Sequence, residues 1–397
     1  AEEAKRVPLT WDEAKGENIA WKTPLENEGH SSAVIGGDLI WFTSATEDGK
    51  KQFVYCLDRH TGKILHHKLL FENPEPEDLG NPINNYAAPS PVLEADAVYI
   101  HFGTYGTARL NPLTAEVEWQ RRDINARHYR GPGSSPYLYK DLLILTFDGI
   151  DKQFVIALNK KTGETVWQTA RTTDYGDLDA DGQPTREGDM RKAYHTPTVF
   201  EIAGKDQLIS VGSRAAFAYD PMTGKEIWTI RHGGFNAALR VLRHENILLI
   251  NTGSERSQMH GLRIDDKMTG DITDSHIVWT RDKRNGSEAS PVIVNGILFQ
   301  ITRGGVVSAT DAKTGTDLWE DRFTGQHLAA GVAAGDRIYY GSDRGLVNVI
   351  RAADKFEVLA SNALEGGADA GITGGISVAD GALFIRTKTH FYKIAQK

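Results

Sequence analysis

A short turn motif recurs along this sequence and constrains the fold more than any other feature. An Asp or Asn stands three residues before a Thr, and Gly follows the Thr in five of six copies. The six pairs are Asp58 with Thr61, Asn111 with Thr114, Asn159 with Thr162, Asp220 with Thr223, Asp266 with Thr269, and Asp311 with Thr314. Successive Thr residues are 53, 48, 61, 46 and 45 positions apart. A period of about 40–50 residues with strand-like content is typical of propellers and solenoids.

The chemistry of the motif predicts a tight hairpin in every repeat. The Asx side chain can bond the backbone of the following turn, and Gly supplies the left-handed conformation. Four copies carry a Trp five residues after the Thr, at Trp119, Trp167, Trp228 and Trp319. An insertion displaces Trp279 in the fifth copy, and His66 takes the position in the first. We therefore expect each repeat to end in a large ring.

The segments before each turn predict four strands per repeat. The first strand opens with Ser or Pro, as in Pro89-Ser90-Pro91-Val92 and Ala289-Ser290-Pro291-Val292. The predicted blades are 31–70, 88–121, 133–171, 193–231, 236–282, 288–323, 330–362, and 371–397 completed by 18–25. The sequence thus predicts an all-β fold, an eight-bladed β-propeller with four-stranded antiparallel blades, the last closed by the N-terminal strand. Such closure removes exposed sheet edges.

The repeats give one propeller domain over 18–397, after a loosely held tail over 1–17 from which Trp11 can pack against the body. A formal net charge of −8 disfavours nucleic-acid binding, and no apolar run reaches the about 18–20 residues of a membrane span. Cys56 is the single cysteine, so no internal disulfide forms. Because the first residue is Ala1, we expect a removed secretory leader and a secreted or periplasmic protein. A closed ring needs no partner for stability, so we expect a monomer.

Several segments give the chain a family resemblance. The repeat motif resembles that of the PQQ-like repeat propellers, which include quinoprotein alcohol dehydrogenases and the propeller lipoprotein of the outer-membrane assembly machinery. The segments Gly29-His30-Ser31-Ser32 and Thr389-His390-Phe391-Tyr392-Lys393-Ile394 are similar to secreted bacterial PQQ-binding-like repeat proteins of unassigned activity. The resemblance implies that each Trp docks against the neighbouring blade. True quinoprotein dehydrogenases resemble one another in an adjacent-cysteine disulfide, a catalytic calcium with an Asp base, and a Trp floor. With Cys56 alone, this chain is not expected to bind PQQ, although disulfide-free quinoproteins keep that alternative open.

An acidic insertion lies within the 61-residue gap between the third and fourth motifs. Asp177, Asp179 and Asp181 occupy positions 1, 3 and 5 of a calcium-loop pattern, Gly182 follows, and Gln183 offers its carbonyl. Position 12 is a glycine flanked by Glu187 and Asp189, so the bidentate carboxylate is out of register. We predict a Ca²⁺ site formed by Asp177, Asp179, Asp181, Gln183 and Asp189, against the alternative of a solvated acidic loop.

The second predicted site is the end of the central channel where the inner strands begin. One set of loops expected there carries His30, Tyr86, His128, Tyr129, Arg130, Tyr194, His195, Asn236, Glu288 and His327, and the other carries Arg214, Arg256, Arg303, Arg344 and Lys388. Nine of these are the predicted ligand-binding residues: His30, Tyr86, His128, Arg130, His195, Arg214, Arg303, His327 and Arg344. These side chains predict a locally cationic funnel that attracts an anionic or polyhydroxylated ligand. Acidic residues in the same loops, such as Asp148 and Asp343, support the alternative that the loop tips are charged only because they are exposed to solvent.

The sequence favours a binding role over catalysis. Ser31, Ser90, Ser135 and Ser290 are repeat residues rather than nucleophiles, and the histidines lack a zinc-binding spacing. The primary hypothesis is a binding or scaffold module for a small ligand, glycan or protein partner. The alternatives are a PQQ- or metal-dependent oxidoreductase with its cofactor in the funnel, and a sugar-active enzyme.

Overall fold

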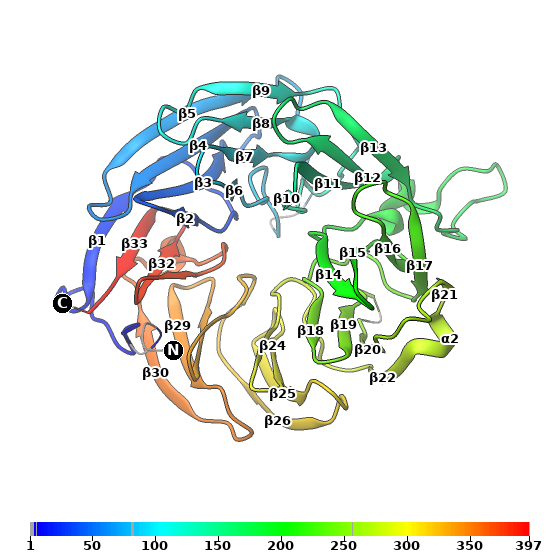
Figure 1. Ribbon diagram of the computed structural model, residues 1–397. Coiled ribbons are helices and arrows are strands. Elements are labelled where there is room, and N and C mark those ends of the chain that lie inside the picture. Colours follow the sequence, from blue (N-terminus) through cyan, green and yellow to red (C-terminus); the bar gives the residue numbers. More distant parts are fainter. Residues whose placement is uncertain (1–3, 5, 81–82, 256, 397) are drawn as a thin grey trace.

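The chain forms a ring of small β-sheets around a common centre (Figure 1). The computed structural model describes residues 4, 6–80, 83–255 and 257–396. Within that part of the chain, eight antiparallel four-stranded units follow one another in sequence order, each extending from the centre of the ring to its outer rim. The predicted eight-bladed β-propeller is therefore confirmed. None of the helices in the described ranges is long and apolar enough to cross a membrane.

The first four blades lie close to their predicted ranges. Blade 1 comprises β2 (Val34–Gly36), β3 (Leu39–Ala45), β4 (Lys51–Asp58) and β5 (Ile64–Glu72). Blade 2 comprises β6 (Val92–Leu93), β7 (Val98–His101), β8 (Thr107–Leu110) and β9 (Val117–Arg121), with the 3-10 turn η1 (Gly103–Tyr105). Blade 3 comprises β10 (Tyr137–Tyr139), β11 (Leu142–Asp148), β12 (Gln153–Asn159) and β13 (Thr165–Ala170). Blade 4 comprises β14 (Thr198–Ile202), β15 (Lys205–Val211), β16 (Ala215–Tyr219) and β17 (Glu226–Arg231), preceded by η2 (Thr185–Arg191).

The remaining blades repeat the pattern with one elaboration. Blade 5 comprises β18 (Leu242–His244), β19 (Ile247–Asn251), β20 (Met259–Arg263) and β22 (Ile277–Arg281). Its insertion forms β21 (Gly270–Asp271), which pairs in parallel with β17, and α2 (Thr273–His276). Blade 6 comprises β23 (Val292–Val294), β24 (Ile297–Ile301), β25 (Val306–Asp311) and β26 (Asp317–Arg322). Blade 7 comprises β27 (Val332–Ala334), β28 (Arg337–Gly341), β29 (Leu346–Arg351) and β30 (Val358–Ala363), followed by η3 (Gly367–Ala370).

Blade 8 joins the two ends of the chain. It comprises β31 (Ser377–Ala379), β32 (Ala382–Arg386), β33 (His390–Ile394) and β1 (Ile19–Pro24). In the antiparallel pair of β1 and β33, Lys22 lies opposite Tyr392, and the Trp21 ring lies 6.0 Å from that of Phe391. The predicted closure by the N-terminal strand is confirmed, because β1 supplies the fourth, outermost strand of blade 8.

The segment before β1 is held more firmly than its polar composition suggested. Val7 is fully buried and Trp11 is 5% exposed, both in a core cluster with residues of blades 7 and 8. The Tyr339 hydroxyl donates to the Pro8 carbonyl at 3.0 Å. The expectation of a loose tail is therefore wrong for this part, because its apolar side chains cover the junction of the last two blades.

The repeated Trp rings lock neighbouring blades together. The indole N–H groups of Trp21, Trp119, Trp167, Trp279 and Trp319 donate to backbone carbonyls at the turn between the third and fourth strands of the next blade, at 3.0–3.3 Å. Where the next turn has the motif Gly, the ring lies where a Cβ would be, as at Gly163 beneath Trp119. His66 makes the corresponding bond to the Leu113 carbonyl at 2.7 Å, and there the next turn carries Ala115 instead of Gly. The imidazole of His66, which is smaller than an indole, thus packs on the one copy of the motif in which Ala replaces Gly.

The fifth copy of the motif differs from its predicted register. Asp266 does not hold the turn; the Asp265 carboxylate accepts the Lys267 N–H at 2.9 Å and bonds His276 at 3.1 Å. The insertion that supplies β21 and α2 replaces the ordinary hairpin here. As a result, Trp228 bonds Gln207 of its own blade at 2.8 Å instead of the next blade.

Candidate functional site: the central cavity

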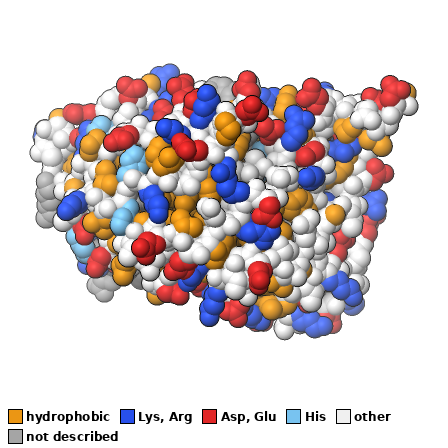
Figure 2. Space-filling model, turned by 90° about the horizontal axis from the view of Figure 1, so that it is seen from above, with side chains coloured by type: hydrophobic (Ala, Val, Ile, Leu, Met, Phe, Trp, Pro, Cys, Tyr) orange, Lys and Arg blue, Asp and Glu red, His pale blue; other side chains and the backbone are white. Residues whose placement is uncertain are grey.

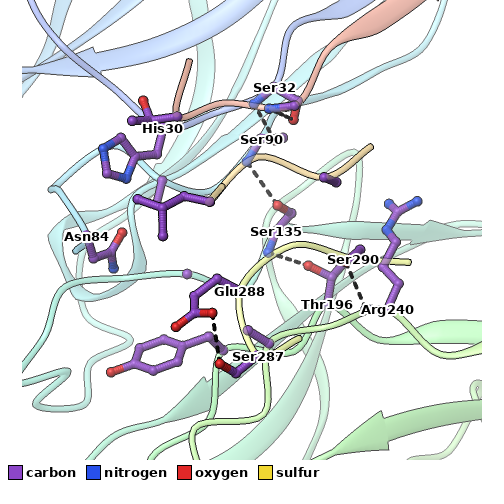
Figure 3. A pocket seen from close by; sticks show the side chains of 18 of the residues that line it. His30, Ser32, Asn84, Ser90, Ser135, Thr196, Arg240, Ser287, Glu288 and Ser290 are labelled. Atoms are coloured by element: carbon purple, nitrogen blue, oxygen red, sulfur yellow. Dashed lines mark hydrogen bonds between the residues drawn. The ribbon is translucent and has the colours of Figure 1, made fainter. Parts of the chain in front are cut away.

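A cavity of about 1000 Å³ opens at the end of the channel where the inner strands begin (Figure 3). All eight blades contribute to its wall through the loop before the inner strand and the alternate residues that follow. Alternation places Ser90 and Val92 of one blade, and Ser290 and Val292 of another, toward the same space. Small hydroxyls and aliphatic side chains thus form most of the wall, and charged groups enter it from the loops.

A series of hydrogen bonds, the hydroxyl ring, runs along the cavity wall through one repeated position. The Ser32 N–H donates to the Ser90 hydroxyl at 2.8 Å, and the Ser90 N–H donates to that of Ser135 at 2.9 Å. In the same way, the Ser135 N–H donates to the Thr196 hydroxyl at 2.9 Å, and the Gly375 N–H of blade 8 donates to the Ser32 hydroxyl of blade 1 at 3.0 Å. Ser90 and Ser135 are therefore structural acceptors between blades, as the sequence indicated for the repeat serines. Figure 3 shows this series of bonds.

Two of the nine residues predicted for the funnel line this cavity, His30 and Arg130. Burial and the nearby positive charges of Arg386 and Lys388 lower the pKa of His30 to about 4, so its imidazole is neutral near pH 7. The Arg130 guanidinium donates to the Leu79 carbonyl at 3.2 Å and lies over the Tyr129 ring. The cavity wall therefore presents a neutral imidazole at His30. At Arg130 it presents a guanidinium that already makes one hydrogen bond within the protein.

Four further predicted residues are packed into the blades and do not belong to the lining. The Tyr86 hydroxyl donates to the Glu77 carbonyl at 2.7 Å. His128 Nε2 accepts the Thr104 N–H at 3.0 Å, and burial lowers the pKa of His128 to about 4. His195 and His327 have no exposed surface; His195 Nδ1 accepts the Val211 N–H and His327 Nδ1 donates to the Gly341 carbonyl. These rings are structural groups of the loops.

The three remaining predicted arginines, Arg214, Arg303 and Arg344, also lie outside the lining. Arg214 donates to the Gly233 carbonyl at 2.6 Å, and Arg303 to the Gln326 side chain at 2.9 Å. Arg256 lies outside the described residues. Charge reversal at Arg303 or Arg344 would therefore not test binding in this cavity.

The lining is balanced in charge rather than cationic. Its described side chains include three cations, Arg130, Lys192 and Arg240, and three carboxylates, Asp189, Glu255 and Glu288. Lys192 is buried, bonds Asp189, and has its pKa lowered chiefly by burial. The rim of the molecule likewise mixes positive and negative side chains, as Figure 2 shows for one side. The charged residues of the lining therefore do not give this cavity a net positive charge.

Sequence interpretation missed Asn84, Lys192 and Arg240, which all line the cavity. Arg240 could have been predicted from the sequence, because it occupies the repeat position that is Ser or Thr in five other blades. Asn84 comes from a long loop before blade 2, where it donates to the Arg130 and Pro132 carbonyls at 2.9 Å. No repeat pattern covers that loop, so its contribution depends on packing.

The acidic loop between β13 and β14 projects from the ring (Figure 1) and is tied by ion pairs. Arg191 holds the Asp177 carboxylate, with nitrogen–oxygen distances of 2.6 and 2.9 Å, and Lys192 bonds Asp189. Asp179 Oδ1 accepts the N–H groups of Asp181 and Gln183. In the described ranges, no three His, Cys, Asp or Glu side chains lie close enough to hold a metal ion. The predicted five residues do not fit calcium as arranged; binding would require Asp177 to leave Arg191, and it stays a prediction.

The residues that the family resemblance associates with a quinone are not gathered at this cavity. Cys56 is buried in β4, where burial raises the pKa of its thiol to about 12. No Trp is among the described lining residues. The wall therefore lacks the disulfide and the Trp floor of true quinoprotein dehydrogenases, and we derive no quinone chemistry here.

Eight blades, Asx-Thr-Gly turns and cross-blade tryptophans define the class of PQQ-like repeat β-propellers. A family model described as outer membrane protein assembly factor BamB matches residues 10–216 and 151–393. The chain therefore belongs to this PQQ-like repeat propeller family. A search of curated proteins found no match.

Solved structures share the fold at low sequence identity. BamB from Moraxella catarrhalis has a TM-score of 0.63 and 14% identity, covering 95% of this chain and 99% of that one. Quinohemoprotein alcohol dehydrogenase from Comamonas testosteroni has a TM-score of 0.67 and 11% identity, and the match covers 100% of this chain and 80% of that one. A europium-containing methanol dehydrogenase has a TM-score of 0.66 and 12% identity, and the match covers 95% of this chain and 93% of that one. At these identities the likeness establishes the fold alone.

Proposed function

We propose that the protein is a binding module that holds a ligand in its central cavity. The observation that carries this proposal is the cavity itself, about 1000 Å³ bounded by all eight blades. Such a volume is at the upper end of the range of small-molecule sites, and its mixture of aliphatic wall and few polar groups is typical of them. A small molecule, a short glycan or a protruding segment of a protein partner fits this description.

The cavity wall offers both a charged and a neutral polar group for recognising a ligand, the Glu288 carboxylate and the His30 imidazole. Glu288 accepts the Ser287 hydroxyl at 2.8 Å and has no cationic partner among the described residues. His30 is held neutral by its surroundings, as its pKa of about 4 indicates. The hydroxyl ring is already bonded between blades, which favours binding over nucleophilic catalysis. We also propose a secreted or periplasmic location and a monomeric state, the former supported by the description of the matching family model.

A ligand screen by thermal shift tests this function, with a variant that fills the cavity. Ala238 lines the wall, so Ala238→Trp should abolish the shift caused by any cavity ligand. Ala180 is exposed on the projecting loop, and Ala180→Trp is the matched control. A ligand that stabilises both variants as well as the wild type would place its site elsewhere and overturn the proposal. The oxidoreductase alternative predicts instead dye reduction after PQQ and Ca²⁺ are added.

A further inference from the structure

One position of the hydroxyl ring carries a cation instead of a hydroxyl. Ser32, Ser90, Ser135, Thr196 and Ser290 each accept the N–H of the preceding blade at this position, at 2.8–3.1 Å. In blade 5 the position is Arg240, whose own N–H donates to Ser290 at 3.1 Å. Blades 7 and 8 carry the uncharged Ala330 and Gly375 there. The repeat thus indicates that an oxygen acceptor should stand beside the Thr196 N–H, whereas the sequence supplies a second donor.

Both donors at this junction lack a partner among the described residues. In the part of the chain that the structure describes, the Thr196 N–H has no hydrogen-bond partner, whereas the Thr196 hydroxyl serves Ser135. The Arg240 guanidinium is exposed in the cavity and has no carboxylate, carbonyl or ring partner in those ranges. The charge of Arg240 also contributes to lowering the pKa of His195, the residue that precedes Thr196. Figure 3 shows both residues on the wall with no bond at the guanidinium.

We infer that the Thr196 N–H and the Arg240 guanidinium form an anion-binding subsite at the junction of blades 4 and 5. An oxygen of a carboxylate or phosphate would take the position of the missing hydroxyl and accept the Thr196 N–H. A second oxygen of the same group would accept from Arg240, whose planar fork matches such anions. The inference rests on the proposed function and specifies it, because it assigns a carboxylate or phosphate group to the cavity ligand.

The test uses Arg240→Ser, which restores the repeat hydroxyl. The introduced hydroxyl would accept the Thr196 N–H as Ser90 accepts that of Ser32, so the variant should fold with a melting temperature no lower than the wild type. Isothermal titration with inorganic phosphate and with citrate then measures the subsite and separates the two sources of anionic oxygen. Losing a charge-assisted hydrogen bond should weaken binding by at least about tenfold. Arg263→Ser, at an exposed arginine of the same blade, is the matched control and should bind as the wild type does.

Amide exchange supplies an independent readout. Phosphate or citrate should slow exchange of the Thr196 N–H in the wild type, while in Arg240→Ser that exchange should be slow without anion. Unchanged phosphate and citrate affinity in Arg240→Ser would overturn the inference. Absence of anion binding in the wild type, together with a neutral ligand blocked by Ala238→Trp, would also overturn it but leave the proposed function intact. An anion that binds equally well to Ala238→Trp would count against both.

Discussion

The contact between Trp119 and Gly163 gives a quantitative test of how neighbouring blades are locked. Gly163 has φ of +75°, and a Cβ there would lie 2.8 Å from Cδ2 and Cε3 of Trp119. Gly163→Ala therefore combines a left-handed backbone cost of about 1–2 kcal/mol with an overpacking cost of about 1–3 kcal/mol. We expect a loss of about 2–5 kcal/mol in the free energy of unfolding.

Two further variants separate these contributions. Gly182 has φ of +74° with nothing near its would-be Cβ, so Gly182→Ala should cost only the backbone part. The natural pair of His66 and Ala115 predicts that Trp119→His relieves the overpacking. In that background, Gly163→Ala should cost about 1–3 kcal/mol less, a coupling that a double-mutant cycle measures.

Urea unfolding followed by far-ultraviolet circular dichroism is the suitable assay, since replacing Trp119 alters fluorescence. The midpoint should fall most for Gly163→Ala, less for Gly182→Ala, and the cycle should yield a favourable coupling between histidine and alanine. Equal losses for the two glycine variants, or zero coupling in the cycle, would refute the claim that the ring and the turn fit each other.

Three other predictions concern buried charge, pH and calcium. Arg171→Met should cost about 3–5 kcal/mol in urea unfolding, because it leaves the buried Asp148 carboxylate without its partner 2.7 Å away; a cost under about 1 kcal/mol would count against a buried pair. His128 binds fewer protons folded than unfolded between pH 6.5 and its folded pKa of about 4, so stability should fall as pH drops through that window, by up to about 3 kcal/mol from this group. His128→Gln should make the pH profile less steep, since His30 contributes in the same direction, and an unchanged slope would contradict the assignment. Arg191→Gln frees Asp177 and should tighten any calcium binding measured by calorimetry on chelator-stripped protein; no calcium heat in either form would dispose of the predicted site.

The fold was predictable because its determinants are local and repeated. Each Asx-Thr-Gly turn needs only a few neighbouring residues, as when the Asn159 side chain accepts the Lys161 and Thr162 N–H groups at 2.9 and 3.1 Å. Six copies with a following ring also determined where blades begin and end. The register failed in the copy containing Asp266, where the insertion moved the turn to Asp265.

The site was less predictable because a loop position does not determine where its side chain points. His195 and His327 stand before inner strands as predicted, but backbone groups of Val211 and Gly341 draw their rings into the blades. The carboxylate of Asp177 fits a calcium pattern in sequence and is held by Arg191 in space. Arg240 could have been found from sequence by aligning the repeats at the serine position rather than by searching for charged loop tips.

Hydrogen exchange of the protein with and without an identified ligand tests the central claim most directly. If the cavity is the binding site, protection should appear in the segments that begin the inner strands, 30–34, 88–92, 133–137 and 194–198, which line it. The outer strands β5, β9 and β13 should exchange as before. Protection confined to those outer strands, with the inner segments unchanged, would contradict the account.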